Sequence, residues 1–154
     1  MESDFLKQLI CRYEMAMFTV NRRVNAMIRD MMPDNLTSDQ FATLRYIRQR
    51  GKCTSTELAD IFCVGKSSIT AIITRLFDKE LIVRQPDDRD RRVIYVMLTA
   101  EGERYADEMG KQIEKLMSRY LHQFREAEAL QFMETFEKLA KLLVESEGEK
   151  GNVT

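Results

Sequence analysis

Apolar residues recur along this chain at spacings that predict long helices at both ends and a mixed segment between them. Over residues 4–33 and 100–146 the apolar positions repeat every three or four residues, a period typical of amphipathic helices. Residues 37–99 hold three shorter helical patterns and two runs of strand-forming residues, at 81–83 and 93–98. We therefore expect a mainly α fold with one small β-hairpin.

Sequence signals mark where several of these helices begin and end. Thr37 and Thr54 are each followed three residues later by Gln or Glu, the spacing of a capping box at a helix start. Thr99 precedes the long pattern that follows the strands and is the expected cap of its first helix. Gly51 and Pro33 are the expected ends of the second and first helices.

The centre of the mixed segment predicts two helices joined by a tight turn at residues 63–65. In the second of them, 66–79, a buried stripe is expected at Ile69, Ile72, Ile73 and Leu76. Gly65 supplies either a left-handed residue or a tight entry into that helix. The opposite face carries small side chains and two cations: Lys66, Ser67, Ser68, Thr70, Ala71, Thr74 and Arg75. Short side chains let a helix approach base edges and phosphates closely, although the same residue types also suit a solvated face.

A charged hairpin follows the second helix directly. Its tip, residues 87–92, interleaves aspartates with arginines and is therefore nearly neutral. Carboxylates at this spacing can hold arginines in one pose through bidentate pairing. Helix, turn, helix and arginine-tipped hairpin together indicate a winged helix, with one helix for the DNA major groove and a tip for the backbone or minor groove. The candidate wing residues are Arg84, Arg89, Asp90, Arg91 and Arg92.

Several short motifs, taken in order, resemble those of the MarR (multiple antibiotic resistance regulator) family of bacterial transcription factors. They are Leu36-Thr37-x-x-Gln40-Phe41, Glu57-Leu58-Ala59, Ile69-Thr70-x-x-x-x-x-Leu76, Leu81-Ile82-x-Arg84, Asp90-Arg91-Arg92 and Leu98-Thr99-x-x-Gly102. The resemblance implies a dimeric winged-helix repressor in which Arg92 enters the minor groove and Asp90 holds it. The chain departs from the family pattern at Gly65, where Ser or Asp is common, and at Glu80, where glycine usually ends the recognition helix.

The helical patterns and the resemblance together predict one domain, residues 1–146, followed by a flexible tail at 147–154. Its dimerisation lobe comprises 4–33 and 100–146, with a break between two helices near Arg125, and its winged-helix DNA-binding lobe comprises 37–99. The first helix carries a long apolar stripe: Leu6, Ile10, Tyr13, Met17, Val20, Val24, Met27 and Met31. We expect a homodimer that covers this stripe and presents two recognition helices ~34 Å apart, about one DNA turn. The alternative is that the stripe belongs to an intramolecular core.

Composition changes this picture only a little. The 154 residues carry a formal net charge of -1, while residues 64–97 hold seven Lys or Arg against five Asp or Glu, a small local basic surplus. The three cysteines, Cys11, Cys53 and Cys63, argue for a reducing compartment, and with no leader in the sequence we expect a cytoplasmic protein. Cys53 and Cys63 flank a helix and are expected to be buried. No apolar run is long enough to cross a membrane.

The expected function is sequence-specific regulation of transcription through double-stranded DNA, by a repressor that a small molecule releases from a palindromic operator. The resemblance implies a ligand pocket between the lobes. An adaptable lining is available from methionines, although methionine also simply fills gaps in a core: Met17, Met27, Met31, Met109 and Met117. One alternative is a repressor that senses peroxides through Cys11, and another is a winged helix that binds only proteins. The sequence shows no enzyme motif and no sign of a cofactor or metal site.

Overall fold

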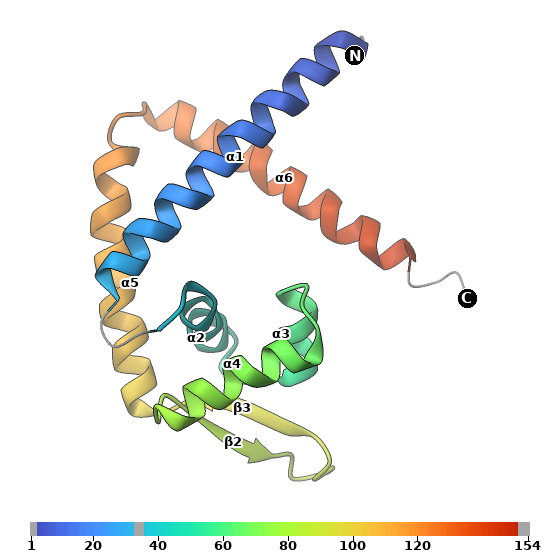
Figure 1. The fold of residues 1–154 in the computed structure, drawn as a ribbon, viewed down its shortest axis with the longest axis vertical. Helices are drawn as coiled ribbons and strands as arrows, with labels where there is room; N and C mark the ends of the chain where they lie inside the picture. The colour runs from blue at the N-terminus through green and yellow to red at the C-terminus, as the bar shows by residue number, and fades with distance from the viewer. Residues whose placement is uncertain (1–2, 33–35, 151–154) are drawn as a thin grey trace. The chain divides into compact units, whose positions relative to one another are not determined.

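The computed structural model describes residues 3–32 and 36–150 and confirms a mainly helical fold with a small antiparallel sheet (Figure 1). Its helices are α1 (Ser3–Met31), α2 (Ser38–Arg50), α3 (Ser55–Ile61), α4 (Lys66–Asp78), α5 (Ala100–Leu121) and α6 (Glu126–Lys150). Its strands are β1 (Cys53–Thr54), β2 (Ile82–Pro86) and β3 (Ile94–Leu98). Residues up to Gln112 form one compact unit, and residues from Ile113 onward form a second.

The predicted helix caps are present. The Thr37 hydroxyl accepts the backbone N–H of Gln40 at 3.2 Å, and the Gln40 side chain accepts the N–H of Thr37 at 3.2 Å. Thr54 and Glu57 form the same reciprocal pair at the start of α3, at 3.2 and 2.9 Å. Gly51 follows α2 with φ of 80°, a left-handed conformation that glycine adopts without strain. Polar residues at fixed offsets therefore set these boundaries.

The sheet has three strands in the order β1-β3-β2, one more than the sequence predicted. β2 and β3 form the expected hairpin, whose register runs from Ile82 opposite Leu98 to Pro86 opposite Ile94. β1 adds a two-residue edge in which Cys53 pairs with Val96. A strand this short shows no alternation, so its pattern could not reveal it. Its effect is to tie the segment between α2 and α3 to the middle of β3.

One apolar core joins the helices and the sheet between residues 36 and 96. Its members are Leu36, Leu44, Ile47, Cys53, Leu58, Ala59, Ile69, Ile73, Leu76, Leu81, Ile82 and Val96. The predicted inner stripe of α4 is confirmed at Ile69, Ile73 and Leu76, which are buried, while Ile72 is half-buried. Because this stripe holds α4 on one side, the opposite face of the helix is fixed toward solvent.

The long terminal helices expose much of their apolar surface. α1 has no buried residue, and along its predicted stripe Ile10 is 48% exposed and Val20 is 54% exposed. The helix ends at Met31, and its expected terminator, Pro33, lies outside the described residues. Within residues 3–32 and 36–150, no helix combines the length and the apolar content that a membrane crossing needs.

The second unit contains the predicted break between two helices. α5 ends at Leu121 and α6 begins at Glu126, where the Arg125 N–H donates to the Glu128 side chain at 3.0 Å. α6 continues to Lys150, so the first four residues of the expected tail are helical. The rest of that tail, 151–154, lies outside the part of the chain that the structure describes.

Candidate nucleic-acid interface and ligand pocket

A tight turn connects α3 to α4. Cys63 adopts φ of 52°, and its N–H donates to the Asp60 carbonyl at 3.1 Å, while the Val64 N–H donates to the Ala59 carbonyl at 3.1 Å. This pair of bonds is a Schellman motif with cysteine at the position that glycine usually takes. Gly65 instead has φ of -69° and is the N-cap of α4, without a side-chain cap. Of the two roles proposed for Gly65, the structure shows the helix entry.

The seven candidate recognition residues all lie on the exposed face of α4. They are Lys66, Ser67, Ser68, Thr70, Ala71, Thr74 and Arg75. Among them, the Thr70 hydroxyl donates to the Lys66 carbonyl at 2.7 Å. The structure therefore brings these residues together on one surface, and small side chains occupy its middle.

The far end of α4 is fastened to the start of α5. Glu80 adopts φ of 58°, and a second Schellman pair closes the helix, with Leu81 N–H donating to the Leu76 carbonyl at 3.0 Å. The Thr99 hydroxyl donates to the Glu80 carbonyl at 2.6 Å and accepts the Gly102 N–H at 3.0 Å, so Thr99 caps α5 as predicted. A Cβ atom at Gly102 would collide with the Leu81 carbonyl, so this junction requires glycine.

Asp87 organises the loop at the tip of the hairpin. Its Oδ1 accepts the backbone N–H groups of Arg89 at 2.8 Å and Asp90 at 3.0 Å, and its own N–H donates to the Val93 carbonyl at 2.8 Å. The N–H groups of Asp90 and Arg89 lower the pKa of the Asp87 carboxyl below its usual value. Sequence reasoning missed this role, although Asp after Pro at a turn is a recognisable signal for such a loop.

Asp90 and Arg92 form the bidentate pair that the Asp-x-Arg spacing predicts. Arg92 donates through Nε to Oδ1 of Asp90 at 3.0 Å and through Nη2 to Oδ2 at 3.1 Å. This pairing lowers the pKa of Asp90 and raises that of Arg92. The Arg92 side chain is nevertheless 91% exposed. The pair thus holds a guanidinium in one orientation while leaving it open to a partner.

The other wing candidates occupy different places. Arg89 and Arg91 are exposed beside the pair at the tip. Arg84 lies on the body of β2, with its guanidinium carbon 4.7 Å from the centre of the Phe77 ring. The structure therefore does not bring Arg84 to the tip. A cation that the sequence did not single out, Lys52, lies 4.4 Å from the centre of the Tyr95 ring, at the sheet edge that β1 forms.

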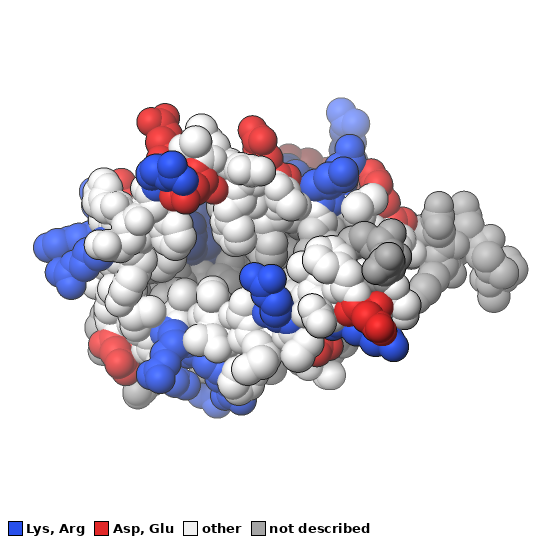
Figure 2. Space-filling view, turned by 90° about the horizontal axis from the view of Figure 1, so that it is seen from above, with Lys and Arg blue, Asp and Glu red and all other residues white. Residues whose placement is uncertain are grey.

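Charges on the molecular surface are mixed in sign. Figure 2 shows Lys and Arg side chains interleaved with Asp and Glu over the face in view, which agrees with the formal net charge of -1. A broad basic surface is therefore absent from that face. Because the net charge of -1 gives no general attraction to nucleic acid, the placement of individual cations such as Arg92 matters more than the total charge.

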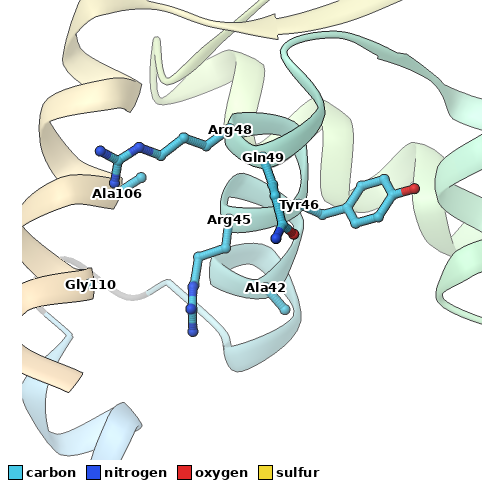
Figure 3. Close-up of a pocket in the computed structure, with 7 residues that line it drawn as sticks. All are labelled: Ala42, Arg45, Tyr46, Arg48, Gln49, Ala106 and Gly110. Carbon is cyan, nitrogen blue, oxygen red and sulfur yellow. The ribbon is translucent and has the colours of Figure 1, made fainter. Parts of the chain in front are cut away.

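A pocket of about 560 Å³ lies between α2 and α5, within the first unit (Figure 3). Its lining combines small side chains with cationic and amide groups: Ala42, Arg45, Tyr46, Arg48, Gln49, Ala106 and Gly110. Figure 3 shows Arg48 reaching from α2 to α5 beside Ala106, whereas Tyr46 points away from α5. None of the methionines named as a candidate lining is among these residues, and Met109 is buried.

Ion pairs at the edge of this pocket connect α2 to α5. Arg48 lies 3.0 Å from Oδ1 of Asp107 and 3.4 Å from Oε2 of Glu103, and Lys111 Nζ lies 2.7 Å from Oδ2 of Asp107. Lys111 and Arg48 together lower the pKa of Asp107. Both of these carboxylates belong to α5, so Arg48 joins α2 to α5 at the pocket.

The three thiols lie in different environments. Cys53 is buried as expected, and burial raises the pKa of its thiol to about 11, so it stays protonated. Cys63 is exposed, which contradicts the expectation of burial, because the left-handed turn carries it away from the core. Cys11 is exposed on α1. Within the described ranges, no three His, Cys, Asp or Glu side chains are grouped as metal ligands.

Comparison with known proteins gives consistent matches. The MarR family model matches residues 36–94. The chain is 33% identical to the HTH-type transcriptional repressor MdtR of Bacillus subtilis over 75% of this chain and 74% of that protein. It is 33% identical to the HTH-type transcriptional regulator FarR of Neisseria gonorrhoeae over 53% of this chain, and that match spans just over half, 56%, of FarR.

A solved structure supports the fold. The structure of Bordetella bronchiseptica BpsR, whose DNA binding is regulated by 6-hydroxynicotinic acid, is 23% identical and covers 84% of this chain and 98% of its own, with a TM-score of 0.71. At this level of identity the likeness establishes the shared winged-helix architecture.

Proposed function

Since the chain belongs to the MarR family of transcriptional regulators, we propose that it is a dimeric repressor that binds a pseudo-palindromic operator and is released by a small molecule. The observation that carries the DNA-binding part is the Asp90–Arg92 pair, which presents an oriented, exposed guanidinium at the tip of the wing. An arginine prepared in this way suits the narrow, electronegative minor groove. From this DNA partner we infer that the protein works in the cytoplasm.

In this proposal α4 lies in the major groove. Ile69, Ile73 and Leu76 anchor the helix in the core, so its outer face is presented without rearrangement. The contacts from this face come from Lys66, Ser67, Ser68, Thr70, Ala71, Thr74 and Arg75, and those from the wing come from Arg89, Arg91 and Arg92. Lys66, at the first turn of α4, is placed for a phosphate, because backbone N–H groups at a helix start also favour anions.

The dimer follows from the exposed apolar surface of the terminal helices. On α1 it comprises Phe5, Leu6, Leu9, Ile10, Tyr13, Met15, Phe18 and Val20. In the second unit it comprises Tyr120, Leu121, Phe124, Leu130, Phe132, Met133, Leu142, Leu143 and Val144. Single exposed apolar residues are ordinary, but continuous rows along long helices mark an interface. A second copy of the chain would cover these rows, making 4–33 and 100–146 a dimerisation lobe.

The effector would enter the pocket between α2 and α5. Arg45 and Arg48 give the lining a positive charge, and Gln49 adds an amide, so an anionic ligand with an apolar body is the best chemical match. Such an anion would compete with Asp107 and Glu103 for Arg48. Because α2 contributes Leu44 and Ile47 to the core that holds α4, a shift of α2 would move the recognition helix.

A selection from random duplexes tests the DNA-binding proposal. The full chain should enrich a pseudo-palindrome with half-sites about one turn apart, and affinity should fall steeply with salt as phosphate counterions are released. A selection that enriches no duplex, in buffer free of candidate effectors, would overturn it.

Light scattering tests the dimer, which should weaken in Ile10→Asp, on the exposed stripe, and persist in the matched control Gln8→Asp.

A further inference from the structure

Thr70 stands out on the recognition face because its hydroxyl proton is already used. Oγ1 of Thr70 donates to the backbone carbonyl of Lys66, one turn earlier in α4, at 2.7 Å. A threonine hydroxyl has a single proton, so this bond leaves none for a phosphate oxygen or a base acceptor. The residue is nevertheless exposed, near the middle of the helix face that would meet DNA.

What Thr70 can still offer a partner is its γ-methyl group and the lone pairs of its hydroxyl. A phosphate oxygen is an acceptor, so neither of these groups would attract it. Next to Thr70, Ala71 is exposed and contributes a second methyl group to the same face. At Thr70 and Ala71 this face therefore presents two methyl groups and no free hydroxyl proton, although a threonine at this position suggests a donor.

In the major groove only thymine presents a methyl group, at C5, and small apolar side-chain groups contact it. We propose that Thr70 is a specificity-determining residue that reads a thymine methyl group in each operator half-site. This inference rests on the proposed DNA-binding function and adds the chemical feature that α4 recognises. It distinguishes thymine from cytosine at that base pair through apolar contact rather than through a donated hydrogen bond.

Replacing thymine by deoxyuridine removes only this methyl group and leaves the base-pairing edge unchanged. The test uses the full chain and the duplex obtained by selection, with each thymine of both half-sites replaced in turn. For the wild type, one position should lose about fourfold in affinity per half-site, the worth of one buried methyl group. Thr70→Ser keeps the hydroxyl and loses the methyl, so it should bind the thymine and deoxyuridine duplexes equally.

Thr70→Val is the matched counterpart, because it keeps a methyl branch and removes the hydroxyl. It should retain the wild-type preference for thymine over deoxyuridine. Melting temperatures of both variants check that the exposed substitutions leave the fold intact. The inference is overturned if no thymine replacement lowers the affinity of the wild type, or if Thr70→Ser still prefers thymine over deoxyuridine. It is also overturned if Thr70→Val loses DNA affinity, because that loss would mean that the Thr70 hydroxyl donates to a phosphate. Failure to select any duplex is a different result, which removes the proposed function itself.

Discussion

At the scale of single residues, Arg92 carries the clearest consequence for DNA binding, since its guanidinium is oriented by Asp90 and still exposed. Arg92→Ala should weaken operator binding by about 1–3 kcal/mol, the usual worth of a specific arginine contact. Asp90→Ala should have a smaller effect, because the arginine remains and loses only its orientation. Fluorescence anisotropy with the selected duplex measures both, and thermal stability should barely change because the tip is solvated.

Arg89→Ala is the matched control, since Arg89 is exposed in the same loop without the paired aspartate. Its loss should reduce affinity less than the loss of Arg92. The reverse order, with Arg92→Ala binding like wild type and Arg89→Ala failing to bind, would mean that the register of the wing on DNA is wrong.

Local spacing made some of these residues predictable and left others hidden. The Asp90–Arg92 pair is two residues apart, so the motif itself indicates the contact. Arg48 and Asp107 are 59 residues apart, and no periodicity in a single sequence connects them. The burial expected for Cys63 was wrong because the expectation treated the turn as part of the packed helix, whereas its left-handed backbone turns the side chain outward.

At the scale of elements, Glu80 at the C-terminal end of α4 has an unfavourable backbone conformation that a substitution should relieve. Glu80 occupies the left-handed position of a Schellman motif, where a side chain is unfavourable and glycine is preferred. Glu80→Gly should therefore raise the free energy of unfolding by about 0.5–1 kcal/mol, a net gain after the added flexibility of the unfolded chain. Urea denaturation measures the change. Glu80→Ala keeps a Cβ atom and should give no such gain; an equal gain from alanine would show that side-chain charge, not backbone conformation, sets the strain.

The ionic link between α2 and α5 predicts a dependence of stability on pH. Lys111 and Arg48 lower the pKa of Asp107 in the folded state, below the ordinary aspartate value of about 4. A carboxyl with a depressed folded pKa stabilises the fold above its unfolded pKa and loses that contribution as pH falls through the folded value. The stability difference between wild type and Asp107→Asn should thus be present at neutral pH and shrink below about pH 4.

This difference should be small, because the side chains involved are substantially exposed and screened by solvent. Urea denaturation of both proteins between neutral and acidic pH measures it. Glu114→Gln, on the same helix, is the control for the loss of one negative charge. A difference between wild type and Asp107→Asn that stays constant across the acid range would exclude a folded-state role for the carboxylate.

Which elements the sequence could predict depended on their length and on polar signals at their ends. α2 and α3 begin where the sequence predicted because Thr37 and Thr54 have partners three residues on. The hairpin followed from two apolar runs around a charged tip. β1 was not predicted because two residues cannot show the alternation of apolar and polar positions typical of a strand. Its pairing with β3 depends on the tertiary fold.

At the scale of the whole molecule, regulation requires that a signal reach the two recognition helices of the proposed dimer. The family resemblance implied a ligand pocket, with methionines as one candidate lining, and a thiol on α1 was the alternative signal. The lining of the pocket between α2 and α5 includes Arg45, Arg48 and Gln49 and no methionine. A lining of this kind depends on which helix faces meet, so side-chain periodicity along one helix could not predict its charge.

Serine substitutions at the two exposed thiols distinguish a ligand signal in the pocket from a thiol signal on α1. Cys11 and Cys63 are both exposed, on α1 and beside α4 respectively. If an anionic ligand in the pocket is the signal, Cys11→Ser and Cys63→Ser should both release operator like wild type when an effective aromatic acid is added. Arg45→Gln should require more of that acid, since it removes a cation from the lining. A screen of aromatic acids by thermal shift identifies the compound, because a ligand bound to the folded protein raises its melting temperature.

The same operator complex is then titrated with an organic peroxide, followed by reductant. Peroxide should not release wild type, Cys11→Ser or Cys63→Ser from the operator, because the proposed switch depends on charge in the pocket and not on thiol oxidation. Reversible release of wild type and Cys63→Ser, lost only in Cys11→Ser, would instead identify a peroxide sensor acting through α1. Since the serine replacements leave the pocket arginines in place, such a result would assign the signal to the thiol and remove the ligand pocket from the mechanism.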